Sequence, residues 1–373
     1  MKRNTYPEML FKQKDLLIQK GYNFAAFQSK SILERYRILH SLQEEYLGSD
    51  KPINHIIPIV SVCIPTYQQH GYIRECVEGA LMQQTSFPFE IVIGDDGSVD
   101  GTTEICMEYA EKYPDKIRFY NRTRELCRVF DEEGHIEIEQ AGNWWWTLQD
   151  GRGIYIAICE GDDYWIDPLK LQKQVDILEN SENVGLCYTK TKVYNQTKNV
   201  FQSDSSLPYK NFQSLLLRNP ITTLTTMYRK ELCDSYLKEV AIDNRKWLMG
   251  DYPLWLWIAS QKDVFFINEV TAVYRYLENS ASHSHGNIQK QLAFNDSVRS
   301  VRLYFIDKFC LDESLILLVN DDYYRRNVYN GIINRDRIFC LQNLKNIRKP
   351  TFRDRIKLVL YHSSLLFNLL TFR

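Results

Sequence analysis

Two adjacent carboxylates, Asp162 and Asp163, follow an apolar run at residues 154–159. A run of this kind is typical of a buried strand, so the pair is expected where the strand ends. Neighbouring carboxylates that are partly removed from water repel each other, and a divalent cation relieves the repulsion. Mg²⁺ or Mn²⁺ would bind carboxylate oxygens and leave positions for phosphate oxygens. The pair therefore predicts a metal–diphosphate site, although the same residues could instead cap the turn that leads into Pro168.

Polar residues also follow two earlier apolar runs. Pro65, Thr66 and Tyr67 come after the β-branched run 59–64, and the segment Asp95-Asp96-Gly97-Ser98 comes after the run 89–94. In an open parallel sheet, ligands bind at the carboxyl ends of the strands. Each segment alone is a weak signal, but all three would lie at one edge of the same sheet.

The elements that position these segments alternate between strands and helices. Helices are expected at 72–84, 102–113, 144–148, 168–180 and 251–259, and strands at 59–64, 89–94, 117–120, 154–159, 185–194, 221–228 and 270–276. Residues 123–140 are polar and partly acidic, and we expect an irregular loop there. The order predicts an α/β fold with a mainly parallel sheet and right-handed crossovers. We divide the chain into an N-terminal helical extension (1–58), a catalytic domain (59–285) and a C-terminal helical region (286–373).

Three motifs carry a resemblance to a known family. Residues 62–67 read VCIPTY, residues 94–102 read GDDGSVDGT and residues 159–165 read CEGDDYW. In this order and spacing they resemble the signatures of family-2 glycosyltransferases with the GT-A fold. That fold is a mixed, mainly parallel sheet flanked by helices. The resemblance covers about residues 59–276 and does not extend to the helical segments at either end.

The resemblance implies roles for the strand-end residues. The base pocket would be lined by Pro65, Thr66 and Tyr67, with the Tyr67 ring against the nucleobase. Asp96 would accept a hydrogen bond from the base, unless it only forms an Asx turn with Gly97; Asp95 is the more structural of the two acids. Asp162 would face the ribose or sugar, and Asp163 would bind Mg²⁺ or Mn²⁺ between the two phosphates.

A general base is also required for inverting transfer, because the acceptor hydroxyl must lose its proton as it attacks the anomeric carbon. The family places this acid at the start of a downstream helix, and Asp251 in the segment Met249-Gly250-Asp251-Tyr252 fits that position. The alternative is that Asp251 only caps the helix. In the polar loop 280–286, His283 is preferred over His285 as a residue that binds the metal or donates to a phosphate. The alternative is that both are ordinary surface histidines. Of the three tryptophans at 144–146, two are expected in the core and one could stack on a sugar.

Composition places few limits on partners. The net charge of −1 gives no reason to expect nucleic-acid binding. The nine cysteines form no CxxC pair and lie mostly in apolar runs, which indicates buried, reduced thiols. With a polar start and no apolar stretch of spanning length, the sequence predicts a cytoplasmic protein. Residues 348–373 are basic and amphipathic, and they either contact the inner face of a membrane as a peripheral anchor or pack on protein.

Together these features predict an inverting glycosyltransferase that uses a nucleotide-sugar donor. UDP-sugars are the default donor for the family, with dTDP- and GDP-sugars as alternatives. The acceptor would be a glycan or a lipid-linked molecule in surface polysaccharide biosynthesis. A catalytically silent nucleotide-sugar binder or scaffold on the same fold is the alternative, but such a protein has no need of Asp251. A nucleotidyltransferase would carry a glycine-rich basic loop after its first strand, and residues 65–70 contain none.

Overall fold

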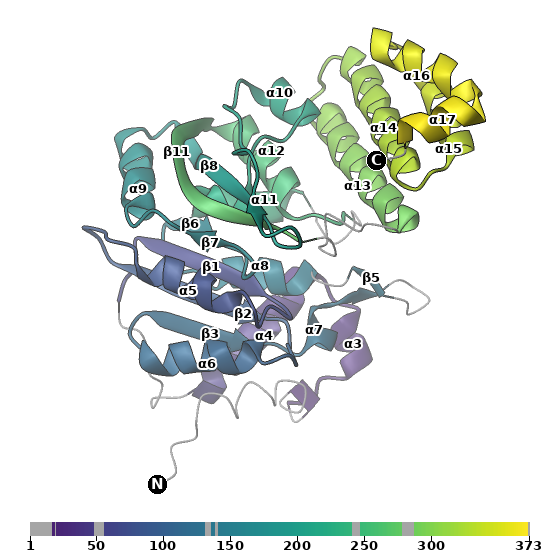
Figure 1. The fold of residues 1–373 in the computed structure, drawn as a ribbon. Coiled ribbons are helices and arrows are strands. Elements are labelled where there is room, and N and C mark those ends of the chain that lie inside the picture. The colour runs from purple at the N-terminus through teal and green to yellow at the C-terminus, as the bar shows by residue number, and fades with distance from the viewer. Residues whose placement is uncertain are drawn as a thin grey trace.

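The computed structural model describes residues 17–18, 20–47, 56–130, 136–138, 141–240, 247–277 and 287–371. At its centre is one large sheet with the strand order β3-β2-β1-β6-β10-β8-β11-β7, and β9 pairs with β8 (Figure 1). The strands are β1 (Val60–Thr66), β2 (Phe89–Asp95), β3 (Ile117–Asn121), β6 (Tyr155–Ile158), β7 (Tyr164–Trp165), β8 (Val184–Asn195), β9 (Val200–Phe201), β10 (Met227–Arg229) and β11 (Asp263–Tyr276).

The sheet is mixed and mainly parallel, as expected from the sequence. β1 pairs in parallel with β2 and β6, β2 with β3, and β8 with β11. β10 runs antiparallel to both of its neighbours, and β7 runs antiparallel to β11. All residues of β1 and β2 are buried, which explains why these strands read as continuous apolar runs rather than as alternating patterns.

Helices cover both faces of the sheet because successive strand side chains point to opposite sides. Val62 and Ile64 pack in the cluster that includes α5 (Ile73–Leu81), α6 (Thr102–Lys112) and α9 (Lys170–Asn180). Cys63, between them, packs on the opposite side. The helices on that side are α4 (Ile32–Leu47), α8 (Ala141–Gln149), α11 (Lys230–Glu239), α12 (Asp251–Gln261), α13 (Ile288–Lys308) and α14 (Ser314–Ile333).

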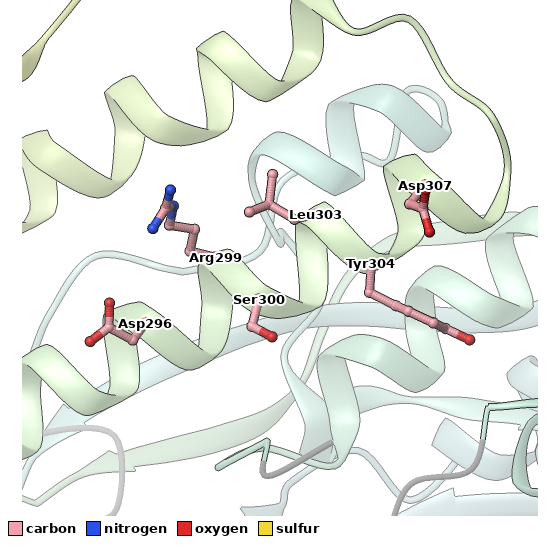
Figure 2. Close-up of a pocket in the computed structure, with 6 residues that line it drawn as sticks. All are labelled: Asp296, Arg299, Ser300, Leu303, Tyr304 and Asp307. Atoms are coloured by element: carbon pink, nitrogen blue, oxygen red, sulfur yellow. The ribbon is translucent and has the colours of Figure 1, made fainter. Parts of the chain in front are cut away.

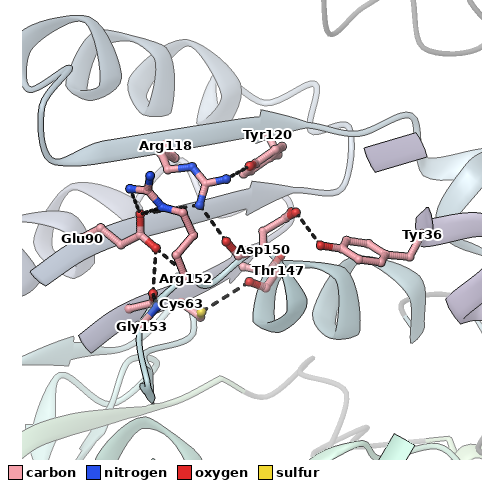
Figure 3. Close-up of polar contacts among 10 residues, drawn as sticks. Tyr36, Cys63, Glu90, Arg118, Tyr120, Thr147, Asp150, Arg152 and Gly153 are labelled. Carbon is pink, nitrogen blue, oxygen red and sulfur yellow. Dashed lines mark hydrogen bonds and ion pairs between the residues drawn. The ribbon is translucent and has the colours of Figure 1, made fainter. Parts of the chain in front are cut away.

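The N-terminal helices α3 (Phe24–Gln28) and α4 are part of this core. The guanidinium of Arg35 is buried and donates to the carbonyls of Leu126 and Arg128 at 3.1 and 2.7 Å. The hydroxyl of Tyr36 donates to Asp150 at 3.0 Å (Figure 3). The expected N-terminal helical extension is interrupted at residues 20–23 and 29–31, and residues 1–16 and 19 lie outside the described part of the chain.

A buried charge network lies at the amino ends of the strands, opposite the predicted site. Glu90 accepts hydrogen bonds from Arg152 at 2.6 Å and from Ser61 at 2.7 Å (Figure 3). Burial alone would raise the pKa of Glu90, but the bonds from Arg152, with the charge of Arg118, lower it overall. Arg118 also donates to the carbonyl of Asp150 at 2.7 Å. The network joins β1, β2, β3 and the end of α8, and so fixes the part of the sheet that carries the site.

The C-terminal region is helical, as expected. Val301 and Phe305 of α13 belong to the core cluster of the sheet. Beyond α14, a separate small cluster joins α15 (Arg337–Asn346), α16 (Phe352–His362) and α17 (Ser364–Thr371). Within the described part of the chain, no helix combines the length and the apolar character needed to cross a bilayer.

Several expected elements differ in the structure. Residues 123–140 are not simply a loop: they contain α7 (Arg124–Cys127) and the paired strands β4 (Val129–Phe130) and β5 (Ile136–Ile138). The expected strand 221–228 is instead the 3₁₀ helix η1 (Thr223–Thr225) followed by β10, because the Thr225 and Thr226 hydroxyls bond nearby carbonyls. The last strand begins at Asp263 rather than at residue 270, and α9 begins after Pro168, at Lys170. α10 (Phe212–Leu217) was not expected. Elements of two or three residues are too short to show a hydrophobic period.

Candidate active site

Tyr67 and Asp96 lie together at the carboxyl ends of β1 and β2. The Asp96 side chain is buried, and Arg124 of α7 binds it with an Nη1–Oδ2 distance of 2.5 Å. The same guanidinium lies over the Tyr67 ring, with Cζ 3.6 Å from the ring centroid. Burial raises the pKa of Asp96 to about 7, although the Cys127 thiol and Arg124 act in the opposite direction. The result is a polar and aromatic cluster at the ends of β1 and β2.

Asp95 has a structural role next to this surface. Its carboxylate accepts hydrogen bonds from the Ser98 hydroxyl at 2.5 Å and from the Thr103 hydroxyl, so it holds the loop after β2 onto α6. Ser98 in turn accepts the backbone N–H of Gln68 at 2.8 Å, which joins the loop after β2 to the loop after β1. Gly97 has φ of +72°, a conformation that favours glycine. The turn is therefore built by Asp95, and Asp96 is left to face the site.

The acidic loop after β6 contacts the end of β1 directly. The N–H of Gly161 donates to the carbonyl of Pro65 at 3.1 Å. A Cβ at position 161 would lie 2.6 Å from the Thr66 hydroxyl oxygen, so only glycine fits there. The Thr66 hydroxyl itself donates to Gln69 at 2.6 Å. This close approach places Glu160, Asp162 and Asp163 beside the base side of the site.

The three carboxyls of this loop differ in their surroundings. Asp163 is only 3% exposed, and its Oδ1 accepts the backbone N–H of Arg275 in β11 at 2.7 Å. Asp162 is partly exposed. Glu160 Oε2 is buried, and no hydrogen-bond partner is found for it among the described residues.

The electrostatics of the acidic loop favour a cation. Removal from water, followed by the charges of Asp162 and Asp251, raises the pKa of Glu160 to about 8. The same removal from water, followed by the charges of Asp162 and Glu160, raises the pKa of Asp163. Several carboxyls that face one another with an unpartnered buried oxygen are unfavourable unless they share protons or bind a cation. The negative charge of these carboxyls is therefore of the kind that a divalent metal ion neutralises.

Asp251 approaches the same loop from the other half of the sheet. It is the first residue of α12, and the cap position before it is Gly250. Its Oδ1 accepts the N–H of Tyr252 at 2.7 Å, and its Oδ2 accepts the hydroxyl of Thr223 in η1 at 2.6 Å. Because its charge raises the pKa of Glu160, the carboxylate lies within electrostatic reach of the acidic loop. Asp251 thus satisfies one free N–H of the helix start and is also part of the charged site.

The three consecutive tryptophans of α8 separate into two environments. Trp145 and Trp146 are 4% and 1% exposed, whereas Trp144 is partly exposed. The Trp144 ring meets Trp145 edge-on at 4.6 Å, and a Cβ added at Gly250 would lie 2.9 Å from it. Trp144 is therefore the one tryptophan of the three that borders the start of α12, next to Asp251.

Comparison with known proteins agrees with this arrangement. Residues 61–128, from β1 to the end of α7, match the profile of Glycosyl transferase family 2. Over this segment, which is 68 of the 373 residues, the chain is similar to that family. The fold, a mixed, mainly parallel sheet flanked by helices with a helical C-terminal region, is the architecture that the sequence predicted.

The curated relatives match only parts of this chain. It is 35% identical over 178 residues to an uncharacterized protein of Mycobacterium tuberculosis, covering 46% of this chain and 47% of that one. It is 29% identical over 248 residues to an uncharacterized glycosyltransferase of Rickettsia felis, covering 64% and 37%. The matches thus span less than half of each relative. Among solved structures, it is similar to a mannosyltransferase of Pyrobaculum calidifontis in complex with GDP-Man and Mn²⁺, with 15% identity, coverage of 96% and 99%, and a TM-score of 0.47.

The structure brings most of the predicted site residues to one sheet edge. Pro65, Thr66 and Tyr67 end β1 or follow it, Asp96 follows β2, and Asp162 and Asp163 follow β6. His283 and His285 lie outside the described residues. In the part of the chain that is described, no three His, Cys, Asp or Glu side chains form a complete metal-binding group. A metal ion at the acidic loop would therefore need ligands from the substrate or from residues beyond the described ranges.

Four residues near the site were not expected from the sequence: Arg124, Glu160, Thr223 and Arg275. A sequence signal for Glu160 was present, because this residue stands directly before Gly161 and two residues before the acidic pair. Arg275 is 6% exposed, lies against the rings of Tyr72 and Tyr164, and pairs with Glu75. Arg124 and Thr223 lie in short elements whose positions depend on tertiary packing.

A separate shallow pocket lies along one helix, away from these residues. It has a volume of about 530 Å³ and is lined entirely by α13: Asp296, Arg299, Ser300, Leu303, Tyr304 and Asp307 (Figure 2). Trp247 borders it, because its indole N–H donates to Ser300 at 3.2 Å and its ring meets Tyr304 at 5.3 Å. None of the strand-end residues lines this pocket, so it is not the site described above.

Proposed function

We propose that this chain transfers a sugar from a nucleotide-diphosphate donor to a hydroxyl acceptor with inversion at the anomeric carbon. The observation that carries the proposal is the convergence of three groups at one sheet edge. They are the base surface of Tyr67 and Asp96, the acidic loop after β6, and the carboxylate of Asp251. A binder without transfer activity would need the first two groups but has no use for the third.

The nucleobase would lie against Tyr67 and Asp96. A buried carboxylate accepts a hydrogen bond from a ring N–H, and uracil offers one such donor at the edge of the ring. Arg124 occupies one face of the Tyr67 ring and orients the Asp96 carboxylate. A UDP-sugar is therefore our proposed donor. Thymine and guanine also carry ring N–H groups, which makes dTDP- and GDP-sugars the comparisons to include in the assay.

The diphosphate would lie over the acidic loop. We propose that Asp163 holds Mg²⁺ or Mn²⁺ and that Asp162 faces the ribose or sugar of the donor. Asp163 uses one oxygen to accept the Arg275 N–H and keeps the other, while Asp162 is the more exposed of the two. His283 is a further proposed ligand. The bound ion would neutralise charge on the departing nucleoside diphosphate. Glu160, with its buried unpartnered oxygen and raised pKa, would add negative charge to this loop once a bound cation displaced its proton.

Asp251 is our proposed general base. As the acceptor oxygen forms its bond to the anomeric carbon, the hydroxyl proton passes to the Asp251 carboxylate and the bond to the diphosphate oxygen breaks. Thr223 and the Tyr252 N–H each bind one of the Asp251 oxygens, so the carboxylate is fixed in orientation. Trp144 of α8, which borders the start of α12, is our proposed stacking partner for a sugar ring.

For the acceptor, we propose a glycan or a lipid-linked glycan intermediate in surface polysaccharide assembly. Two features support this proposal: the aromatic ring of Trp144 near Asp251, and the positively charged, partly apolar C-terminal helices. Nucleoside diphosphate release should be measured with UDP-, dTDP- and GDP-sugars, with and without EDTA. We expect release from one nucleotide class that stops when the metal is chelated. A silent binder would be favoured instead if the wild type binds a nucleotide sugar tightly but releases no nucleoside diphosphate, whichever acceptor is added. If EDTA does not change the rate of nucleoside diphosphate release, the proposed role of the metal is wrong.

A further inference from the structure

The helices α16 and α17 have one face that packs on protein and one that does not. Tyr361 and Phe367 are buried and meet edge-on at 4.9 Å, within the small cluster that also contains residues of α14 and α15. Asp354 is buried too, where it accepts hydrogen bonds from Thr351 and from Arg325 of α14. These contacts fix both helices on the C-terminal region, beyond α14 and away from the sheet (Figure 1).

The opposite face of these two helices is apolar and exposed. On α16 the exposed apolar side chains are spaced four and three residues apart, which places them on one side of the helix. On α17 they form two adjacent pairs, one turn apart. The side chains and their exposed fractions are Phe352 (78%), Ile356 (41%), Val359 (72%), Leu365 (68%), Leu366 (40%), Leu369 (65%) and Leu370 (55%). So many large apolar side chains on two consecutive helices indicate a surface that is covered in use.

The charges around this apolar face all have one sign. The exposed basic residues of the segment are Arg348, Lys349, Arg353 and Arg355, and Lys357 is partly exposed. The only acidic residue from position 348 to 371 is Asp354, which is buried and paired with Arg325. A second copy of the chain would bring these like charges together, which disfavours self-association through this face. An anionic surface complements them.

We propose that the outer face of α16 and α17 binds the surface of an anionic lipid bilayer. The apolar side chains would enter the boundary between headgroups and acyl chains, and the basic side chains would meet the lipid phosphates. This is binding at the surface, in keeping with helices of 11 and 8 residues. It does not depend on the proposed transfer reaction, because it requires no nucleotide sugar.

Vesicle sedimentation tests the proposal with the full chain. Phosphatidylcholine vesicles with about 30% phosphatidylglycerol should bind the protein, and pure phosphatidylcholine should bind it much less, because each basic residue strengthens partition to an anionic surface about fivefold. The variant Val359→Gln/Leu365→Gln/Leu369→Gln should reduce the partition coefficient roughly tenfold or more, since binding scales with buried apolar area. The variant Arg353→Gln/Arg355→Gln should reduce it about 25-fold on anionic vesicles only.

A matched control carries three similar changes on other exposed apolar residues: Ile154→Gln, Val200→Gln and Leu207→Gln, which are 55%, 48% and 51% exposed. This control should bind as the wild type does. The proposal is overturned if the wild type ignores anionic vesicles, if it binds neutral vesicles equally well, or if the α16–α17 variants bind like the control. A change in oligomeric state in place of a change in vesicle binding would show that a second copy covers this face, and would also overturn it.

Discussion

Replacing Asp251 with asparagine should remove the base and leave α12 in place. Asparagine keeps a carbonyl oxygen that can accept the Tyr252 N–H, which Asp251 now accepts at 2.7 Å. The Thr223 hydroxyl can rotate to accept a hydrogen bond from the new amide. The geometry of the helix start is therefore preserved, and only the ability to take a proton is lost.

The expected effects on activity and on stability differ in size. Loss of a general base lowers kcat by about 10²- to 10⁴-fold. Loss of a negative charge at a helix N-terminus costs about 0.3–1 kcal/mol of unfolding free energy. Relief of the repulsion between Asp251 and Glu160 offsets part of that cost. The melting temperature should therefore change by about 3 °C at most.

The assay is release of nucleoside diphosphate, with thermal unfolding measured on the same samples. Asp312→Asn is the matched control: Asp312 precedes α14 and accepts the Ser314 N–H at 2.8 Å, in a helix start outside the site. It should lose similar stability and no activity. If Asp251→Asn keeps kcat within about threefold of the wild type, Asp251 is a cap and not the base.

Thr223 provides a second test of the same assignment. Thr223→Val keeps the size of the side chain but removes the hydroxyl that donates to Asp251 at 2.6 Å. We expect kcat to fall about tenfold, the value of one hydrogen bond to a charged group. Thr223→Ser should restore most of it. Equal loss in both variants would mean that Thr223 acts through packing and does not orient the carboxylate.

Three further outcomes are expected. Arg124→Ala should weaken nucleotide binding about 10- to 100-fold by calorimetry, because Asp96 loses the charge that favours its ionised form and Tyr67 loses its ring contact. Affinity for Mn²⁺ should rise with pH up to about 8, by at most about tenfold per pH unit. The reason is that the raised pKa of Glu160 keeps a proton on the acidic loop, which the metal must displace. The variant Glu160→Gln should show a smaller rise. Arg35→Ala should lower the free energy of unfolding in urea by about 2–4 kcal/mol, because two buried carbonyls lose their donor and a cavity forms.

The two arginine variants each have a matched control on the same chain. Arg74 also pairs with a carboxylate and lies over a tyrosine ring, but at the surface, so Arg74→Ala should leave nucleotide binding unchanged. Arg37 is exposed on the same helix as Arg35, and Arg37→Ala should cost little stability. A flat pH profile for Mn²⁺, or equal effects of Arg35→Ala and Arg37→Ala, would contradict the corresponding argument.

The sequence by itself determined the parallel half of the fold and the edge on which the site lies. The runs that became β1, β2 and β6 are apolar because both faces of those strands are buried, and each run ends abruptly in polar residues. Local signals of that kind survive without any knowledge of packing. The sequence alone therefore places three segments at one edge of the sheet: Pro65–Tyr67, Asp96 and the acidic pair.

Tertiary structure decided which of these side chains face the site. Asp95 and Asp96 are adjacent and chemically identical, yet hydroxyl donors from Ser98 and Thr103 bind the first, and Arg124 binds the second. Asp163 contacts the backbone of β11, which is more than a hundred residues away in sequence. No local pattern records such long-range contacts, because they depend on where other elements pack.

Long-range packing also determined the surroundings of the acidic loop and of the C-terminal helices. Asp162 and Asp163 were recognised as a charged pair from sequence alone, but the contributions of Glu160 and Asp251 to that charge arise only when β6 and α12 come together. From the sequence alone, the basic segment 348–373 could equally be helical and packed on protein or helical and in contact with a membrane. Packing decided that one face, with Tyr361 and Phe367, is buried, and that the other, with Val359 and Leu369, is left exposed.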